Sequence, residues 1–581
     1  MAHRLIATTA VAAAAATLAG CSWMSSKPDS TPATAGATAP MRNVADTCRS
    51  LAGQIIEPGQ IGASAKLASG PARIDSASWQ SAAPIAVAER GPTPAALITP
   101  ATPAYCKVLG QIAPVDLKAP PIQFQINLPA QWNGRSVQYG GGGFNGTLIT
   151  GLGLLPAARF DQPAPLARGY VTYGTDSGHQ TKPGEAPQAF ALNDEAALNF
   201  FHASYKKVRD VAVAVMGQAY GRAPDKLYFV GSSEGGREGL MMAQRYPADF
   251  DGIFSRVPVL HWTGLQFAGA RNGIATMDGG WIRPAQVKLV HEAVLAACDA
   301  ADGVADGIVS DAAGCRGRFD VSRLRCQTSG GAPASDNCLS DAQVKAVQAL
   351  HSPYRFPFTL ANGLTDYPGW GVSGENTTSY GPTGGWLSWW LGKAPPAVPP
   401  AADNSIAWVY GAGALQYVYA RDPKIDPRQV TPEKYAARVR EVSALMDATN
   451  PDLSAFHARG GKLIVLENMA DYAQSPYAGI GYVESVQARM GAGKTAEFLR
   501  LYTAPGVDHV GSGAPSQVDM LQALADWVEK GRAPAGLQLV EQAPKAPFTV
   551  QRARPLCEWP AWPRYQGSGD VNAAASFACT R

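Results

Sequence analysis

Apolar and polar residues alternate along residues 122–128, the pattern of a half-buried antiparallel strand. Buried strands are also predicted at three short apolar runs, 137–139, 227–230 and 463–466. Helices are predicted at three longer stretches, 194–220, 236–246 and 517–530. Asp194 is the expected cap of the first helix and Gly221 its expected end. Strands that alternate with helices near both ends of the chain predict an α/β fold with a parallel sheet.

The middle of the chain, residues 260–450, lacks this alternation. It is rich in Gly, Pro and Trp and holds four of the nine Cys. We interpret it as an insertion that covers the active edge of the sheet as a lid. The catalytic domain is then expected to consist of two segments, residues 46–259 and 451–581.

Composition narrows the classes of function. The chain has 581 residues, of which 46% are hydrophobic and 16% charged, and its formal net charge is +3. A chain this long and apolar can bury a large core, which excludes a wholly disordered protein. A near-neutral charge does not provide the basic face that nucleic-acid binding needs, so no nucleic-acid partner is expected.

The N-terminus has the features of an export signal. The apolar run from Leu5 to Leu18 is too short to remain as a transmembrane helix, and no other stretch is predicted to span a membrane. The run ends in a sequence that resembles a bacterial lipoprotein processing site, so residues 1–21 are predicted to be a signal peptide and Cys21 the lipidated residue. An ordinary signal peptide with a chance Cys is the alternative, and both export the chain. Residues 22–45 are predicted to be a flexible linker. The expected location is secreted, periplasmic or anchored to the outer membrane.

Eight Cys remain after Cys21, an even number that is typical of disulfides in an exported chain. Eight Cys allow 105 pairings, so spacing alone does not determine the bridges. None of them has the CxxC spacing of a zinc site. The simplest proposal pairs them in sequential order, as Cys48–Cys106, Cys298–Cys315, Cys326–Cys338 and Cys557–Cys579.

A nucleophile motif lies between a predicted strand and a predicted helix. The sequence Gly231-Ser232-Ser233-Glu234-Gly235 fits G-x-S-x-G, in which two glycines allow a tight turn that exposes the serine at its apex. A structural turn is the alternative interpretation. With a strand before it and a helix after it, the motif indicates Ser233 as a catalytic nucleophile.

A serine nucleophile needs a histidine base and an acid that orients the base. In α/β-hydrolases the acid and then the histidine follow the serine in the chain. His509, on a loop after the apolar run 499–502, is the remaining candidate once the His residues in or before the insertion, and His457, which precedes the expected acid, are set aside. Asp471, which follows the strand at 463–466, is the predicted acid. Asp508, which precedes His509 directly, could compete for the role of the acid, but adjacent side chains on an extended loop point apart.

The reaction also requires backbone donors for the oxyanion. One is expected to be the N–H of Glu234, directly after the nucleophile. The other is expected in the run of glycines at 140–143, of which Gly143 is the chosen position. A plain glycine turn is the alternative.

Three carboxylates lie within eight residues of the insertion, at Asp299, Asp302 and Asp306. This pattern suits a hard cation such as Ca²⁺, although the spacing is not that of an EF-hand. An acidic surface loop is the alternative. A bound ion would brace the insertion rather than take part in the reaction.

Together, these residues resemble the tannase and feruloyl esterase family, and within it the mono(2-hydroxyethyl) terephthalate hydrolases. The resemblance covers nearly the whole mature chain and is carried by six segments, 131–135, 231–239, 299–308, 386–391, 459–462 and 567–570. It implies an α/β-hydrolase core with a large lid, the triad and oxyanion donors named above, and the sequential disulfides. It also implies a structural Ca²⁺, held by the side chains of Asp299, Asp302 and Asp306 and the carbonyls of Val304 and Ile308.

The chain departs from the family in two places. The residues before the nucleophile and after the catalytic histidine are usually Cys joined by a disulfide, but here they are Ser232 and Val510, so packing must brace the triad. In terephthalate monoester hydrolases a lid Arg holds the substrate carboxylate. The alignment places Trp408 at that position, and Arg421 is a possible substitute. Trp262 and Trp386 are predicted to stack on a substrate ring, with Trp408 also in the pocket.

We therefore expect an exported serine esterase that cleaves esters of aromatic acids, of the feruloyl, galloyl or mono(2-hydroxyethyl) terephthalate type. A monomer that acts on a small aromatic ester is expected. Two alternatives remain open. One is a broad esterase for small aliphatic esters, and the other is a surface protein that binds aromatics or glycans and keeps a vestigial triad.

Overall fold

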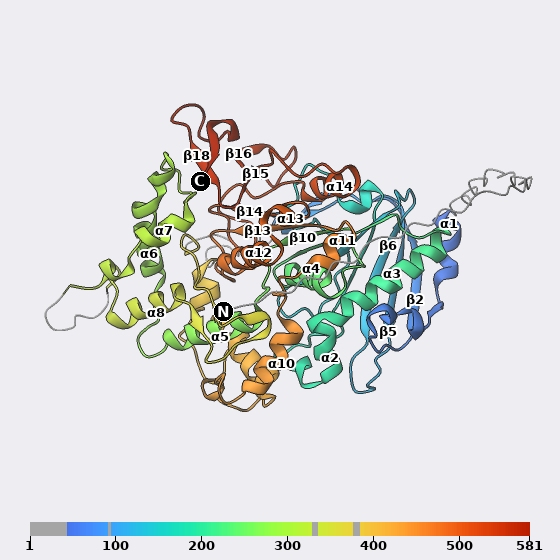
Figure 1. Cartoon of the computed structure of the whole chain (residues 1–581), viewed down its shortest axis with the longest axis horizontal. Coiled ribbons are helices and arrows are strands. Elements are labelled where there is room, and N and C mark those ends of the chain that lie inside the picture. Colours follow the sequence, from blue (N-terminus) through green and yellow to red (C-terminus); the bar gives the residue numbers. More distant parts are fainter. Residues whose placement is uncertain (1–42, 91–93, 328–334, 376–383) are drawn as a thin grey trace, which may run out of the picture. The chain divides into compact units, whose positions relative to one another are not determined.

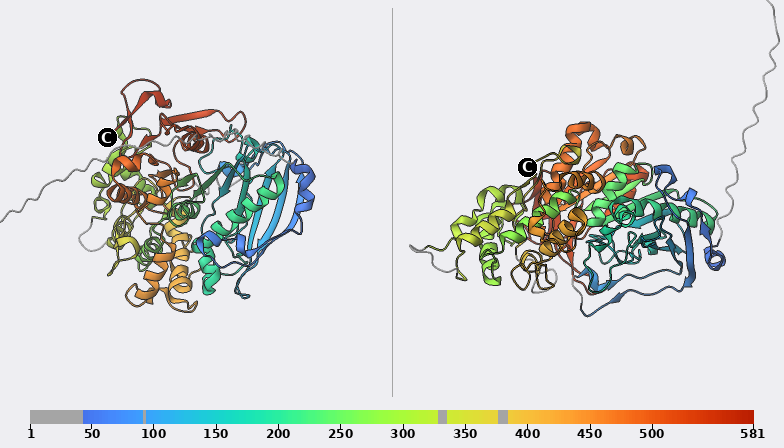
Figure 2. Two further views of the ribbon diagram at one scale, coloured as in Figure 1. Left: turned by 45° about the vertical axis from the view of Figure 1, so that its right-hand side comes forward. Right: turned by 90° about the horizontal axis from the view of Figure 1, so that it is seen from below.

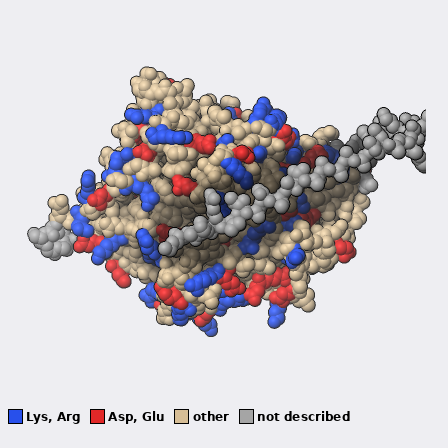
Figure 3. Space-filling model, in the orientation of Figure 1, with Lys and Arg blue, Asp and Glu red and all other residues tan. Residues whose placement is uncertain are grey.

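The computed structural model describes residues 43–90, 94–327, 335–375 and 384–581. The predicted signal peptide, Cys21 and almost all of the predicted linker lie outside the described residues. Within the described ranges, every helix is too short or too polar to cross a membrane. On the face shown in Figure 3, Lys and Arg side chains lie among Asp and Glu side chains.

Within the described residues, eleven strands form one mixed sheet (Figure 1). Its centre is parallel and has the spatial order β8 (Val171–Thr175), β7 (Arg135–Tyr139), β9 (Lys226–Ser232), β10 (Gly252–Arg256), β13 (Lys462–Asn468) and β14 (Leu499–Ala504). Antiparallel strands extend both edges, with β6 (Ile122–Pro129), β5 (Tyr105–Ile112), β2 (Ala72–Gln80) and β1 (Ile55–Ile56) beyond β8, and β17 (Cys557–Glu558) beyond β14. The parallel α/β sheet predicted from the sequence is confirmed.

The central strands are buried along nearly their whole length because helices cover both faces of the sheet. Leu463 and Val465 of β13 pack in one core with α4 (Glu234–Arg245) and α12 (Pro476–Met490). Their neighbours Ile464 and Leu466 pack in a second core with α14 (Met520–Lys530). Alternate residues therefore enter opposite cores. The carboxyl ends of the parallel strands lie at one edge of the sheet.

The predicted helix over 194–220 is interrupted. It consists of α2 (Asp194–Leu198), a π-helical turn at Asn199–Ala203, and α3 (Ser204–Tyr220). The cap is Asn193 rather than the predicted Asp194, because the Asn193 side chain accepts the N–H of Ala196 at 2.9 Å. Gly221 ends the helix as predicted, with the left-handed φ of 75°.

The antiparallel strand predicted at 122–128 is present as β6, but the prediction that it is half-buried is wrong. Its polar residues Gln125 and Asn127 are 4% and 0% exposed. The Gln125 amide donates to Asn127 Oδ1 at 2.8 Å, and the Asn127 amide donates to the carbonyl of Thr150 at 2.7 Å. The alternation predicted that these polar side chains face solvent. Instead, a loop covers this face, and the side chains form hydrogen bonds within the protein.

A helical insertion separates β10 from β13. It contains α5 (Trp262–Ala275), α6 (Pro284–Cys298), α7 (Ala312–Arg318), α8 (Asp341–His351), α9 (Ile406–Gly413) and α10 (Ala436–Met446), and the short pair β11 (Tyr354–Arg355) and β12 (Asp366–Tyr367), whereas the short α11 (Ser454–Ala458) that follows packs in the core of the catalytic sheet. Figures 1 and 2 show these helices, coloured green to orange, on the opposite side from the blue strands β2 and β5. The absence of a strand–helix rhythm in the sequence corresponds to this helical segment.

Short elements complete the fold. They are α1 (Val44–Thr47), β3 (Ala86–Val87), β4 (Ile98–Thr99), α13 (Ala492–Ala496), β15 (Gln538–Gln542), β16 (Val550–Pro555), β18 (Trp562–Tyr565) and β19 (Phe577–Thr580).

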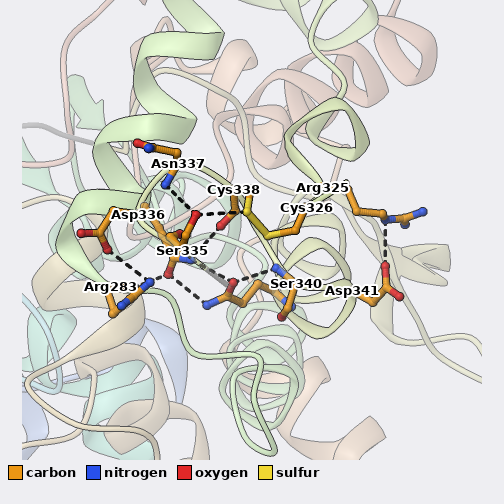
Figure 4. The surroundings of a disulfide bond; sticks show 11 residues. Arg283, Arg325, Cys326, Ser335, Asp336, Asn337, Cys338, Ser340 and Asp341 are labelled. Atoms are coloured by element: carbon orange, nitrogen blue, oxygen red, sulfur yellow. Dashed lines mark hydrogen bonds and ion pairs between the residues drawn. A yellow bond between two sulfur atoms is a disulfide. The ribbon is translucent and has the colours of Figure 1, made fainter. Parts of the chain in front are cut away.

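In the described part of the chain, four disulfides join the Cys pairs in the sequential order predicted. Figure 4 shows Cys326–Cys338 in the insertion, flanked by the ion pairs Arg283–Asp336 and Arg325–Asp341. Disulfides of this number are typical of proteins that fold outside the cytoplasm.

Candidate active site

Ser233 lies in a strained turn between the end of β9 and the start of α4. Its φ and ψ are 61° and −121°, a conformation that a non-glycine residue rarely adopts. The flanking glycines are required by close contacts: a Cβ at Gly231 would lie 2.1 Å from the carbonyl oxygen of Gly235, and one at Gly235 would lie 2.7 Å from that of Gly141. The local geometry is that of a nucleophile elbow.

The three residues predicted as a triad are hydrogen-bonded in series. His509 Nε2 is 2.9 Å from Ser233 Oγ, and His509 Nδ1 is 2.7 Å from Asp471 Oδ2. Asp471 follows β13 and His509 follows β14, so neighbouring parallel strands bring them to one edge. The other carboxylate oxygen of Asp471 accepts the N–H groups of Ala473 and Gln474 at 2.7 and 3.0 Å. These bonds hold the acid in line with the imidazole.

Asp508, the possible competitor, points elsewhere. Its Oδ1 atom accepts three backbone N–H groups in the turn that follows His509, those of Val510, Gly511 and Ser512. Asp508 therefore shapes the loop that carries His509, whereas Asp471 contacts the imidazole.

The two backbone N–H groups of the oxyanion prediction have no acceptor in the part of the chain that the structure describes. The N–H groups of Gly141 and Gly142 have side-chain acceptors, whereas none is found among the described residues for Gly143 or Glu234. Gly143 has a left-handed φ of 59°, and a Cβ there would lie 2.9 Å from the hydroxyl of Tyr410. A glycine is thus needed at this position, which lines the same cleft as Ser233.

The cleft has a volume of about 930 Å³ and contains Ser233 and His509 in its lining. Its lining includes several aromatic rings, among them those of Phe144, Trp262, Trp389 and Tyr410. Tyr410 meets Phe144 edge-on at 4.9 Å between centroids, and Trp389 lies 6.1 Å from the ring of His509. This aromatic frame next to the serine can hold a flat ring.

Trp262 is in the cleft as predicted, but the predictions for Trp386 and Trp408 are wrong. Trp408 is 0% exposed, and its indole N–H donates to the carbonyl of Ala397 inside the insertion. Trp386 packs near His351 in the core of the insertion. Trp389 and Tyr410 take their places. Tyr410 lies two residues after Trp408 in α9, and positions two apart are on nearly opposite sides of an α-helix. The turn that carries Trp389 is π-helical, a phase shift that periodicity does not reveal.

Arg421 does not line the cleft, because it pairs with Asp194 and donates to the carbonyl of Leu192. Among the described residues that line the cleft, Arg256 is the one Lys or Arg. It is 5% exposed, and its guanidinium donates to Ser232 Oγ at 3.0 Å. Burial lowers the pKa of Arg256, and the charges of Asp508 and Asp471 oppose that effect. A polar contact, not packing alone, therefore braces Ser232.

His179 is a structural residue in this fold. It is 3% exposed, and Nε2 lies 2.8 Å from the carbonyl oxygen of Phe144. Its ring stacks on Phe190 at 3.8 Å. Burial lowers the pKa of His179 to about 4, so the imidazole is neutral at pH 7.

The predicted calcium loop is folded around its own carboxylates. Asp299 accepts the N–H of Gly307 at 3.1 Å, and Asp306 pairs with Arg554. Asp302 is 1% exposed, and its Oδ2 atom has no hydrogen-bond partner within the described ranges. Burial raises the pKa of Asp302, and the nearby charges of Asp306 and Asp299 raise it further.

These observations fit a cation at Asp302, since an orphaned buried carboxylate oxygen beside two other carboxylates is a site that a hard cation would stabilise. Side chains alone do not make the site: no group of three or more His, Cys, Asp or Glu in the described ranges is placed to hold a metal ion. Backbone carbonyls would have to complete the coordination.

The comparisons with known proteins agree with this geometry. The family model described as "Tannase and feruloyl esterase" matches residues 106–580. An uncharacterized esterase of Agrobacterium fabrum is 39% identical over 82% of this chain and 85% of its own. The mono(2-hydroxyethyl) terephthalate hydrolase of Piscinibacter sakaiensis is 34% identical over 86% of this chain and 89% of its own. A likeness to a mono(2-hydroxyethyl) terephthalate hydrolase is thus present, but the uncharacterized esterase has the higher identity, so the comparisons support the family and not one substrate within it.

Among solved structures, feruloyl esterase B from Aspergillus oryzae superposes with a TM-score of 0.71 at 23% identity, covering 90% of this chain and 100% of that one. The fold and the arrangement at its strand edge define a hydrolase of the α/β-hydrolase fold with a helical insert. The chain belongs to the tannase and feruloyl esterase family, and it is a carboxylic ester hydrolase. This membership sets aside the alternative of a binding protein with a vestigial triad.

Proposed function

We propose that the chain hydrolyses esters of phenolic aromatic acids, of the feruloyl or galloyl type, through an acyl-enzyme. The observation that carries the proposal is the hydrogen-bonded series from Ser233 through His509 to Asp471, beside an aromatic cleft. Ester hydrolysis requires a nucleophile, a base and donors for the oxyanion, and each has a candidate here.

The reaction follows from the distances. Ser233 Oγ attacks the ester carbonyl while His509 Nε2 takes its proton, and Asp471 stabilises the imidazolium and holds its tautomer. The N–H groups of Gly143 and Glu234 donate to the tetrahedral oxyanion. His509 then protonates the leaving alcohol. Water, deprotonated by His509, cleaves the acyl-enzyme and releases the acid.

The aromatic frame supports an aromatic acyl group. Trp262, Trp389, Tyr410 and Phe144 offer ring faces and edges, and an aromatic pair contributes about 0.5–1.5 kcal/mol beyond its buried area. A small aliphatic acid would leave most of these ring surfaces uncovered. Gln266 also lines the cleft and can hydrogen-bond a phenolic hydroxyl.

The charges in the cleft support a neutral acyl group. Arg256 is the one Lys or Arg of its described lining, and the negative charges of Asp508 and Asp471 act on it. A terephthalate monoester would bring a free carboxylate to a guanidinium whose charge is already balanced. Burying an unpaired carboxylate is costly, so phenolic acids are favoured over terephthalate.

A direct comparison tests this substrate class. Acid release from methyl ferulate, methyl gallate and mono(2-hydroxyethyl) terephthalate would be followed by chromatography, with Ser233→Ala as the blank. We expect kcat/KM for a phenolic ester to exceed that for the terephthalate by about tenfold or more. Faster release of terephthalate would contradict the charge argument. A higher kcat/KM for p-nitrophenyl acetate than for all three would favour a broad esterase of small aliphatic esters.

We also propose that a Ca²⁺ ion braces the insertion and takes no part in the reaction. The carboxylates of Asp302, Asp299 and Asp306 would hold it, with the carbonyls of Val304 and Ile308. The orphaned Oδ2 atom of Asp302 supports this proposal.

For the location, we propose an exported protein that is released or anchored through a lipid at Cys21. The four disulfides support folding outside the cytoplasm. Labelling with a fatty-acid analogue, compared between the full chain and its Cys21→Ser variant, tests the anchor. Equal labelling of both would exclude lipidation at this residue.

A further inference from the structure

Two side chains, Glu238 and Asn145, lie behind the glycine loop that ends at Gly143. Glu238, on the second turn of α4, is 1% exposed. Its Oε2 atom accepts the N–H of Gly141 at 2.9 Å, and its Oε1 atom accepts the Asn145 amide at 2.8 Å. Asn145 Oδ1 in turn accepts the N–H of Gly142 at 2.7 Å. The pair therefore binds the two N–H groups that precede Gly143.

Backbone hydrogen bonds also fix the glycine loop. Gly235, at the start of α4, donates its N–H to the carbonyl of Gly141 at 3.1 Å. Asn145 donates its own N–H to the carbonyl of Gly142 at 2.9 Å, and it holds a left-handed φ of 56°. The chain is thus fixed on both sides of Gly143, whose N–H has no acceptor among the described residues.

The carboxylate has a charged neighbour that makes it a strong acceptor. Burial raises the pKa of Glu238, whereas the charge of the adjacent Arg237 lowers it. Arg237 itself donates twice to Glu234 Oε1, at 2.8 and 2.5 Å. One buried turn of α4 therefore orients both backbone donors, Glu234 directly and Gly143 through Glu238.

We propose that Glu238 and Asn145 are positioning residues that hold the Gly143 N–H where the oxyanion forms. The inference rests on the proposed function of Gly143. Oxyanion donors act through their placement before the reaction, and loss of one costs about 100- to 1,000-fold in kcat in other hydrolases. A displaced loop should therefore lower kcat and leave ground-state binding almost unchanged.

The hydrogen-bond pattern permits a reciprocal test. In Glu238→Gln, the new amide meets the Asn145 amide, so two donors face each other. In Asn145→Asp, two carboxylates face each other. In the double variant, the introduced glutamine accepts the N–H of Gly141 on its side-chain oxygen and donates its amide to the introduced aspartate. That aspartate still accepts the N–H of Gly142. Donor and acceptor are exchanged, and every bond of the clamp can form again.

The experiment compares the wild type, both single variants and the double variant, using hydrolysis of p-nitrophenyl acetate and inhibition by a trifluoromethyl ketone that forms a tetrahedral adduct. We expect each single variant to lose about 10- to 100-fold in kcat and in affinity for the ketone, with KM within about threefold of wild type. The double variant should recover most of both losses. Glu529→Gln, which weakens the part-buried ion pair with Arg135 beside Tyr228, far from the glycine loop in sequence, serves as the control for general destabilisation, with thermal unfolding measured for all.

Two results would overturn the proposal. One is a pair of single variants that keep wild-type kcat. The other is a folded double variant whose activity does not exceed that of the single variants. This second result applies even if the single variants fail to fold. p-Nitrophenyl acetate contains no phenolic acid, so these results concern the clamp, whereas slow release of ferulate and gallate would contradict the proposed substrate class alone.

Discussion

Replacing Asp471 by Asn tests whether the acid works through the tautomer of His509. Asp471 accepts the backbone N–H groups of Ala473 and Gln474 on Oδ1, and on Oδ2 it contacts His509 at 2.7 Å and accepts the Gln474 side-chain amide at the longer distance of 3.3 Å. Asn has one acceptor oxygen. If that oxygen keeps the two backbone N–H groups, its amide faces His509 Nδ1. The imidazole must then carry its proton on Nε2, where it faces Ser233 and cannot act as a base.

The magnitude follows from which contacts Asn can keep. The opposite orientation of Asn would serve His509 but would set the amide against two backbone donors at 2.7 and 3.0 Å, so the inactive orientation is preferred. Loss of the correct tautomer in serine proteases lowers kcat on the order of 10⁴-fold. This factor corresponds to about 5 kcal/mol of transition-state stabilisation. Binding of substrate should change little, because no contact to the cleft is removed.

The assay is steady-state hydrolysis of methyl ferulate, with Asp508→Asn as a matched control. Asp508 is adjacent to His509 but accepts only backbone N–H groups on its Oδ1 atom, and the Asn oxygen can accept the same bonds. We expect the control to keep kcat within about tenfold of wild type. The reasoning would be refuted if Asp471→Asn lost less than tenfold, or if both variants lost activity equally.

The remaining predictions concern stability and the cleft. Removal of Ca²⁺ by a chelator should lower the Tm of the wild type and not that of Asp302→Asn; an unchanged wild-type Tm would exclude a structural ion. Burial raises the pKa of Asp447 from 3.8 to about 7, so the folded protein holds a proton that the unfolded chain releases. The contribution of Asp447 to the unfolding free energy, measured in urea, should therefore be greatest below about pH 4 and be lost as the pH rises through 7, and Asp447→Asn should change the slope of the wild-type curve by this contribution. An unchanged slope would assign it to other groups. Trp389→Ala should raise KM for methyl ferulate about two- to tenfold and hardly affect p-nitrophenyl acetate, and equal changes for both would argue against ring contact.

The triad could be predicted from the sequence because strand order constrains it. Ser233 and His509 are 276 residues apart, yet each follows a recognisable apolar strand. The carboxyl ends of parallel strands share one edge, so residues just beyond three such strands must lie near one another. The chain order of serine, acid and histidine then removed the other candidates. The spatial prediction needed no knowledge of the insertion.

The substrate pocket could not be predicted in the same way. Residues 386–391 are apolar almost throughout, so their sequence does not indicate which side faces the cleft. Trp386 and Trp389 differ by three residues, and the π-helical turn between them changes the angle further. The side that faces the cleft is determined by how the insertion packs against the catalytic sheet. That packing is a tertiary property and leaves no periodic signal.

The first turns of α4 show where hydrophobic patterning fails for a functional reason. Glu234, Arg237 and Glu238 would be assigned to a solvated helix face, yet all three are at most 1% exposed. Burying such charges stabilises little and is tolerated only where each is paired or hydrogen-bonded. Here Glu238 accepts a backbone N–H of the glycine loop, and Arg237 joins the side chain of Glu234 to backbone carbonyls beyond α4. A charged cluster that is buried directly after a G-x-S-x-G motif is therefore better explained by the orientation of two N–H donors than by stability, and the Glu238–Asn145 exchange separates these explanations.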